Sequence, residues 1–313
     1  MESNPTVTII TPVFNGADYI EETIYSVLNA KTTVRFEYIV IDDGSNDDTH
    51  KIVQNFAQKI IFIRQTNIGE ANTVNKGLNI AKGKYILVLS ADDPLLSGDL
   101  LDQATHILNQ KATIAAVYPD WNVIDKTGKI TSTKILPEYS DEIMIGKCKT
   151  LPGPGTIFRK DLALSIGGRN GDWRFVSDFD FWLRLSRKGE IRRIPNVLAQ
   201  WRYHDTSTSI AHRGLEMAQE RIAVIDRFIS DNSIDSKLSR NAQGNALYMA
   251  ARLSFFDPRV KGRSLLFKAI KKNRKIPSES RTIVIIFLFL LPLSRAVVKF
   301  IPQEVIKLLG TKS

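Results

Sequence analysis

The fold is decided by residues 7–16, VTIITPVFNG, a run of β-branched and apolar side chains that ends at a turn. Such a run predicts a buried strand, because branched and apolar side chains suit the inside of a sheet. Residues 18–29 then place Ile20, Ile24 and Val27 on one face, as in an amphipathic helix. A buried strand that leads directly into an amphipathic helix indicates the first unit of an α/β fold.

The same alternation continues beyond this helix. Further strands are predicted over residues 38–41, 60–63 and 85–89, and helices over residues 47–56 and 70–82. Strands that alternate with helices form parallel sheets whose connections cover both faces. We therefore predict an α/β fold with a doubly wound, mainly parallel sheet flanked by helices.

The second half of the chain gives looser signals. Residues 155–159 are typical of a strand, residues 179–185 of a helix, and residues 214–275 of a set of helices. We predict an α/β domain over residues 1–213, followed by a helical C-terminal extension over residues 214–313.

Composition limits the class of protein. With 313 residues, 43% of them hydrophobic and 24% charged, the chain can bury a sizeable core. Cys148 is the one cysteine, and the N-terminus lacks the basic and apolar regions of a signal peptide. We therefore expect a cytoplasmic protein without an internal disulfide.

The net charge of +10 belongs to the C-terminal tail. Residues 260–313 contain twelve Lys and Arg against Glu279 and Glu304, and the first 259 residues are close to neutral. The basic residues there flank an apolar segment rather than alternating with stacking aromatics, so we do not expect nucleic-acid binding.

That apolar segment, residues 283–293, is shorter than the roughly 20 residues that span a bilayer. Basic clusters lie on both sides of it, which fits an interfacial or re-entrant membrane segment over residues 268–301. The protein would then lie peripherally on the cytoplasmic face of a membrane. A core helix or a dimer contact is the alternative.

Polar and acidic residues follow three of the predicted strands: Phe14-Asn15, Asp42-Asp43 and Asp92-Asp93. In doubly wound sheets ligands bind beyond the carboxyl ends of the strands. Acidic turns would give the same pattern, since Asp, Gly and Ser are common turn residues. Two acidic strand ends in one domain favour a site, because neighbouring carboxylates need a cation or hydrogen-bond donors to balance them.

The Asp92-Asp93 pair suits a divalent cation such as Mg²⁺ or Mn²⁺, since these ions prefer carboxylate oxygens. His204 is a candidate third ligand or a phosphate contact. Arg184 and Arg202 are candidates for binding a diphosphate or an acceptor, with ion pairing or a solvated helix face as the alternative.

Several segments together resemble family 2 glycosyltransferases. The resemblance is close over residues 7–15, 40–48, 69–77 and 87–94. It continues more loosely through Gly155-Thr156-Ile157-Phe158-Arg159, Ile166-Gly167-Gly168, Ser177-Asp178 and Trp201-Arg202-Tyr203-His204. The combination is more specific than any one of these motifs.

The resemblance implies a GT-A fold and transfer of a sugar, with inversion at the anomeric carbon, from a nucleotide-diphosphate donor that is by default a UDP-sugar. It places Pro12, Phe14, Asp43 and Asp92 at the nucleotide. The acceptor would be a hydroxyl of a glycan or lipid-linked molecule in cell-surface polysaccharide synthesis.

The resemblance also implies that Asp92 and Asp93 belong to the metal motif and that Asp178 is the general base. Asp178 is alternatively, or in addition, the N-cap of the helix that follows it. The family motif is often Asp-x-Asp-Asp, whereas this chain has Ser90 at the first position. The division of roles between Asp92 and Asp93 therefore stays open.

Other classes of protein fit less well. An NAD-dependent oxidoreductase would carry Gly-x-Gly-x-x-Gly after the first strand, and a nucleotidyltransferase would carry a Gly-rich basic loop there. Residues 11–16, TPVFNG, match neither of these motifs. A catalytically inactive, membrane-bound nucleotide-binding scaffold of the same fold is the alternative, which Ser90 favours and the retained acidic residues oppose.

Overall fold

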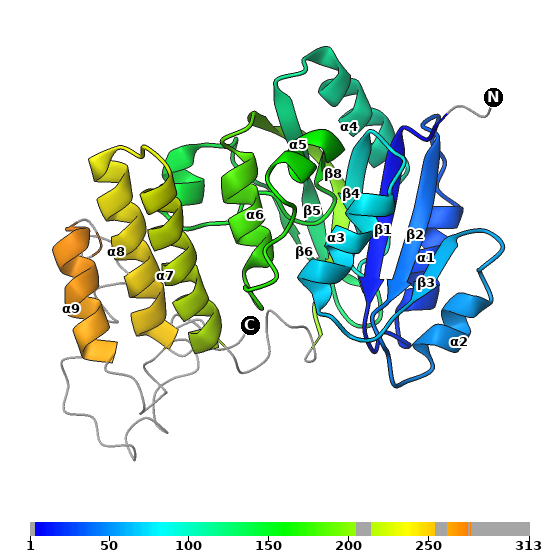
Figure 1. The fold of residues 1–313 in the computed structure, drawn as a ribbon, viewed down its shortest axis with the longest axis horizontal. Coiled ribbons are helices and arrows are strands. Elements are labelled where there is room, and N and C mark those ends of the chain that lie inside the picture. Colours follow the sequence, from blue (N-terminus) through cyan, green and yellow to red (C-terminus); the bar gives the residue numbers. More distant parts are fainter. Residues whose placement is uncertain (1–3, 205–213, 254–261, 275, 277–313) are drawn as a thin grey trace. The chain divides into compact units, whose positions relative to one another are not determined.

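The computed structural model describes residues 4–204, 214–253, 262–274 and 276 (Figure 1). The chain forms two compact units. The first contains residues up to Tyr139 and Thr150–His204, and the second contains Ser140–Lys149 together with the C-terminal helices. The predicted boundary between residues 213 and 214 adjoins residues 205–213, which lie outside the described part, and it stays a prediction.

The first unit is built on an eight-stranded mixed sheet in the order β3-β2-β1-β4-β7-β5-β6, with β8 paired to β5. The strands are β1 (Val7–Val13), β2 (Phe36–Asp42), β3 (Ile61–Arg64), β4 (Tyr85–Val88), β5 (Ile114–Ile124), β6 (Ile130–Lys134), β7 (Ile157–Arg159) and β8 (Glu190–Arg202). The pairs β1–β2, β1–β4, β2–β3 and β5–β8 are parallel, and β7 and β6 pair antiparallel to their neighbours. The predicted fold class is confirmed.

Helices cover both faces of this sheet (Figure 1). They are α1 (Ile20–Leu28), α2 (Thr49–Gln54), α3 (Glu70–Ile80), α4 (Asp99–Gln110), α5 (Lys160–Ser165) and α6 (Ser177–Leu185). Alternate residues of β1 separate the faces: Ile9 packs in one core cluster with α1, α2 and α4, whereas Ile10 meets Gly77 of α3. Strand β1 is therefore buried on both sides, which explains why it is apolar along most of its length.

Three strands, β5, β6 and β8, were not predicted. β5 contains Pro119 and Asp120, and its pairing with β8 shifts register at these residues. Proline inside a run argues against a strand. The buried Asp120 carboxylate accepts from Arg193 of β8 at both oxygens, at 2.9 and 2.6 Å, and from the amide of Leu136 at 2.9 Å. When two charged residues pair across neighbouring strands, neither strand shows the apolar pattern by which a strand is predicted from the sequence.

The described part of the second unit contains a π-helical turn, η1 (Glu142–Gly146), and the helices α7 (Gly214–Asp231), α8 (Ser236–Leu253) and α9 (Gly262–Lys272). These helices lie within the predicted helical range. Cys148 is buried here, its thiol 3.2 Å from the carbonyl of Ala242, and burial raises the pKa of this thiol to about 12. The thiol is therefore protonated at neutral pH.

Among the described residues, no helix is both long and apolar enough to cross a bilayer. The predicted membrane segment, residues 268–301, begins in α9. Its apolar stretch, residues 283–293, lies outside the described residues.

Gly83, in the turn between α3 and β4, gives a test of the close packing of β1. A Cβ at this position would lie 2.6 Å from the carbonyl carbon of Val7 and would overlap the backbone nitrogen of Thr8. We expect Gly83→Ala to lower the free energy of unfolding by about 2–3 kcal/mol, because backbone atoms cannot move aside as a side-chain end can. Urea denaturation measures the change.

The matched control is Lys82→Ala, which shortens an exposed side chain in the same turn. Equal stability of Gly83→Ala and Lys82→Ala would contradict the close approach of the turn to β1.

Candidate functional site

The carboxyl ends of β1, β2 and β4 meet at one edge of the sheet. Val13 at the end of β1 lies opposite Asp42 at the end of β2, and Ile10 lies opposite Val88 of β4. The strand order 3-2-1-4 reverses direction between β1 and β4. Ligands bind outside the strand ends at such a reversal point. The three polar segments of the sequence therefore follow strands that lie side by side where a ligand is expected.

The loop after β1 is held by the loop after β2. The amide of Asn15 donates to Ser45 Oγ at 2.9 Å, and the amide of Gly16 donates to Thr49 Oγ1 at 2.9 Å. Phe14 lies between these bonds and β1, with 49% of its surface exposed. An exposed ring on a fixed loop suits stacking on a nucleotide base. Pro12 is within β1, opposite Ile41.

Asp43 holds a loop of its own. Its Oδ1 accepts hydrogen bonds from Gln65 Nε2 at 2.8 Å and from the amide of Ile68 at 2.9 Å, and its Oδ2 accepts one from the amide of Gly69 at 2.9 Å. The side chain is buried, with 3% of Asp43 exposed. The carboxylate therefore orders residues 65–69, and Oδ2 keeps capacity for one further donor.

The acidic pair after β4 is brought together with His204. His204 Nε2 lies 2.8 Å from Asp92 Oδ2, and Asp93 Oδ1 accepts the amide hydrogen of Arg202 at 2.7 Å. Because β8 ends at Arg202, its pairing beside β5 delivers His204 to the turn after β4. Asp92 and His204, which are far apart in the sequence, are thus in direct contact, and their role as metal ligands stays a prediction.

Asp93 lies in a place where a negative charge is unfavourable. Burial, and then the charge of Asp92, raise the pKa of the Asp93 carboxyl well above its ordinary value, while bonds from the Arg202 amide and the Ser90 hydroxyl act in the opposite direction. Ser90 is the position at which the family motif often has a third acid. Here it supplies a hydrogen-bond donor to Asp93 instead.

The side chains of Asp92, Asp93 and His204 have the types of donor atom that bind divalent metals. Carboxylate oxygens and an imidazole nitrogen bind Mn²⁺, and carboxylates bind Mg²⁺. Within the described part of the chain, no three or more His, Cys, Asp and Glu side chains are arranged to hold a metal ion. A metal at Asp92, Asp93 and His204 would therefore need further ligands, which the phosphate oxygens of a nucleotide can provide.

Arg202 has structural partners. It is 1% exposed, and its guanidinium donates to the Asp92 carbonyl at 2.8 Å, to Glu22 Oε2 at 2.7 Å and to the Asp125 carbonyl at 3.2 Å. The same group lies 4.9 Å from the centre of the Tyr19 ring. Of the two interpretations of Arg202, ion pairing agrees with these contacts. From inside the protein, Arg202 positions the acidic turn.

Arg184 is held in the same manner. Its Nε donates to Asp180 Oδ2 at 2.8 Å, and its two terminal nitrogens donate to the carbonyls of Ile166 at 2.6 Å and Gly168 at 2.8 Å. These bonds attach α6 to residues 166–168. A contact of Arg184 with a diphosphate or an acceptor stays a prediction.

Asp178 is the second residue of α6. The helix begins at Ser177 after Val176, and no side chain caps it, so the expectation that Asp178 is the N-cap is wrong. The physical reason is that helical geometry already includes Ser177. Asp178 Oδ1 accepts its neighbour's amide hydrogen, from Phe179, at 2.7 Å. No hydrogen bond or ion pair among the described residues joins it to Asp92 or Asp93.

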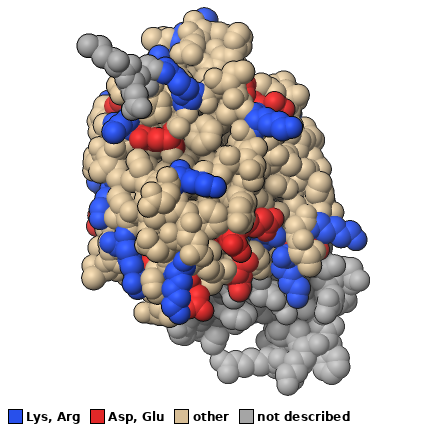
Figure 2. Space-filling view, turned by 90° about the vertical axis from the view of Figure 1, so that its right-hand side faces the viewer, with Lys and Arg blue, Asp and Glu red and all other residues tan. Residues whose placement is uncertain are grey.

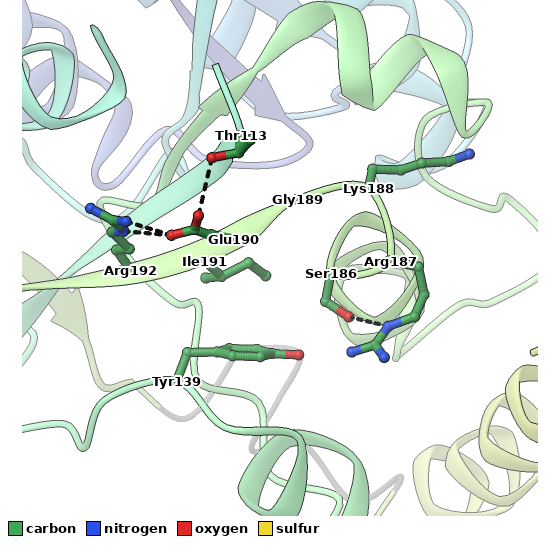
Figure 3. A pocket seen from close by; sticks show the side chains of 9 residues that line it. All are labelled: Thr113, Tyr139, Ser186, Arg187, Lys188, Gly189, Glu190, Ile191 and Arg192. Carbon is green, nitrogen blue, oxygen red and sulfur yellow. Dashed lines mark hydrogen bonds and ion pairs between the residues drawn. The ribbon is translucent and has the colours of Figure 1, made fainter. Parts of the chain in front are cut away.

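A separate hollow of about 610 Å³ lies at the amino ends of β5 and β8 (Figure 3). Glu190 accepts from Thr113 Oγ1 at 3.0 Å and pairs with Arg192 on its rim. None of the predicted site residues lines it. Because Arg202 is at the opposite end of β8, this hollow is remote from the strand-end site.

The comparison with protein families identifies the chain. Residues 8–164, half of the chain, match the family model "Glycosyl transferase family 2". The chain belongs to this family, as the resemblance of its strand-end motifs indicated.

Two relatives show how far the similarity extends. An uncharacterized glycosyltransferase of Rickettsia typhi is 33% identical over 221 residues, which are 66% of this chain and 66% of the relative, just under two thirds of its length. The chondroitin synthase of Escherichia coli is 30% identical over 212 residues, which are 66% of this chain but 30% of the synthase.

Solved structures share the fold. TarS 1–349 of S. aureus in complex with UDP-GlcNAc has a TM-score of 0.59 and 18% identity, over 89% of this chain and 82% of that chain. The mannosyltransferase PcManGT of Pyrobaculum calidifontis, in complex with GDP-Man and Mn²⁺, has a TM-score of 0.56 and 16% identity, over 99% of this chain and 86% of that chain. At these identities the likeness shows a GT-A-like fold.

The three hydrogen bonds that the Asp43 carboxylate accepts predict that this side chain stabilises the 65–69 loop. An Asn at this position keeps one acceptor oxygen but turns an amide group toward the donors of the 65–69 loop. We expect Asp43→Asn to lower the free energy of unfolding by about 2 kcal/mol in the absence of any nucleotide, because it removes charge-assisted bonds to a buried group. Urea denaturation measures this, and hydrogen exchange at Ile68 and Gly69 should become faster.

Asp48→Asn is the matched control, since Asp48 is an exposed residue that pairs with Lys51 on the surface. A loss as large in Asp48→Asn as in Asp43→Asn would argue against the loop-holding role of Asp43.

Proposed function

We propose that the protein is an inverting glycosyltransferase that moves a sugar from a nucleotide-diphosphate donor, by default a UDP-sugar, to a hydroxyl group. The observation that carries this proposal is the contact of Asp92 with His204, beside Asp93, at the reversal point of the sheet. Membership of family 2 supports it. So does the presence of sugar nucleotides in TarS and PcManGT, which have the same fold.

The nucleotide would bind along the ends of β1 and β2. Phe14 offers an exposed ring to the base, and Pro12 precedes it by two residues within β1. The remaining capacity of Asp43 Oδ2 is available to a donor group of the base, such as the imino N–H of uracil. Asp92, on the neighbouring strand end, is the candidate contact for the ribose or for the metal.

Asp92, Asp93 and His204 would hold a divalent cation, Mg²⁺ or Mn²⁺. When bound, such a cation neutralises charge on the departing diphosphate. The structure of PcManGT, which contains Mn²⁺, supports this choice. Because burial and Asp92 raise the pKa of the Asp93 carboxyl, the cation would act there by favouring the ionised carboxylate.

Asp178 is the proposed general base. The acceptor oxygen attacks the anomeric carbon on the face opposite the diphosphate, the bond from that carbon to the diphosphate oxygen breaks, and the hydroxyl proton passes to the Asp178 carboxylate. One displacement of this kind inverts the anomeric configuration. Asp178 is partly exposed, as a base that meets an incoming acceptor must be.

The acceptor we propose is a hydroxyl of a glycan or lipid-linked molecule in cell-surface polysaccharide synthesis in the cytoplasm. The sequence similarity to a chondroitin synthase supports a glycan acceptor.

Donor hydrolysis tests the transferase proposal without knowledge of the acceptor. Nucleoside diphosphate release is measured from UDP-, dTDP- and GDP-sugars with Mg²⁺, Mn²⁺ or EDTA. We expect metal-dependent release from one donor class, and Asp93→Asn should reduce it to background because a ligand charge is lost. Asp99→Asn, an exposed acid at the start of α4, is the control.

Absence of release, combined with absence of metal-dependent nucleotide binding in calorimetry, would overturn the transferase proposal. Metal-dependent binding without release from any donor would instead favour the inactive scaffold.

Asp178→Asn separates catalysis from donor binding. Asn is nearly the same size but cannot accept the proton, so kcat for transfer should fall by about 10²–10⁴-fold while the Kd for the donor stays the same. Stopped transfer assays with the identified donor measure kcat, and calorimetry measures Kd. Asp172→Asn, an exposed acid in the preceding loop, should leave both unchanged. Full activity of Asp178→Asn would remove Asp178 from the mechanism.

A further inference from the structure

One face of α9 combines cations with an exposed aromatic ring. The helix packs against α8 through its other face, where Leu266 and Ala269 are buried. Residues spaced by four positions share a side of a helix. The exposed side, called here the basic face of α9, contains Arg263, Phe267, Lys268, Lys271 and Lys272.

Phe267 is 63% exposed. Single exposed apolar residues are common on protein surfaces and need no explanation by themselves. Phe267 differs in its surroundings, because Lys268 is its neighbour and Lys271 follows one turn later on the same side. An exposed ring with lysines beside it on the same helix surface is a feature of helices that lie in a membrane interface.

The lysines of this face have no acidic partner within the described residues. Lys268 and Lys271 form no ion pair among them, and Lys272 bonds to a neutral group, Gln243 Oε1, at 2.8 Å. Neither α8 nor α9 contains an Asp or a Glu. In contrast, Figure 2 shows Lys and Arg mixed with Asp and Glu on the face that it presents.

We propose that the basic face of α9 docks on an anionic lipid bilayer. Lys268 and Lys271 lie at the level of the phosphate groups, and Phe267 enters the layer between headgroups and acyl chains. A bilayer offers negative charge and an apolar layer side by side, which matches both features of the face. A nucleic-acid duplex offers phosphate to the lysines but no apolar layer to Phe267, and a single ring gives no row for stacking bases.

The test is co-sedimentation of the full chain with phosphatidylcholine vesicles that contain or lack phosphatidylglycerol, at low and at high salt. We expect binding to the anionic vesicles that weakens as salt is added. Lys268→Gln/Lys271→Gln should weaken it roughly 30-fold, since each lysine near an anionic surface contributes roughly fivefold. Phe267→Ser should weaken binding at both salt concentrations, because insertion of the ring does not depend on charge.

The matched control is Lys59→Gln/Lys82→Gln, which removes the same charge from exposed positions of the first unit. It should bind as the unchanged chain does. All of the substituted side chains are exposed, so circular dichroism and thermal unfolding should be the same for every variant.

Equal vesicle binding by the two double-lysine variants would overturn the proposal, as would equal binding of the unchanged chain to neutral and anionic vesicles. Binding to duplex RNA without binding to vesicles would assign the face to nucleic acid instead. The assay contains no sugar donor, so its outcome is independent of the proposed transferase activity.

Discussion

A guanidinium group that is buried at the end of a sheet must find partners for its donors, because an unpaired cation there is strongly disfavoured. Arg202 finds them in the turn after β4, in Glu22 of α1 and in the carbonyl of Asp125. Its amide also donates to Asp93. These bonds join the end of β8 to the end of β4, so β8 helps to fix the position of the acidic pair.

The acids at the strand ends therefore have two kinds of task. Asp43 orders the 65–69 loop, and Asp93 receives the end of β8, before either meets a ligand. An acidic turn and an acidic ligand site were opposing interpretations of the sequence, but in the structure one carboxylate can serve both. Because one side chain has both roles, a substitution that removes a ligand also loosens the loop that carries its neighbours. Binding and stability therefore have to be measured together.

The sequence predicted the elements whose signal is local. β1, β2, β4 and α1 follow from periodic apolar residues, and the strand-end rule grouped Phe14, Asp43 and Asp92. β5 and β8 were not predicted, because Pro119 interrupts the apolar pattern of β5 and the Asp120–Arg193 pair places a charged residue inside each strand. The contact of His204 with Asp92 and the buried bonds of Arg202 also depend on residues far apart in the chain. No local pattern contains them, so the sequence offered His204 only as a candidate ligand, from its chemistry and from the family resemblance of residues 201–204.

The parallel pairing of β5 with β8 has a consequence for folding during synthesis on the ribosome. β5 is almost entirely buried in the finished sheet, yet the edge that β8 covers has no partner until residues 190–202 have left the exit tunnel. An apolar strand with an open edge is a template for pairing between chains. The growing polypeptide thus passes through an interval of exposure to aggregation, which ends with the arrival of the same strand that completes the site.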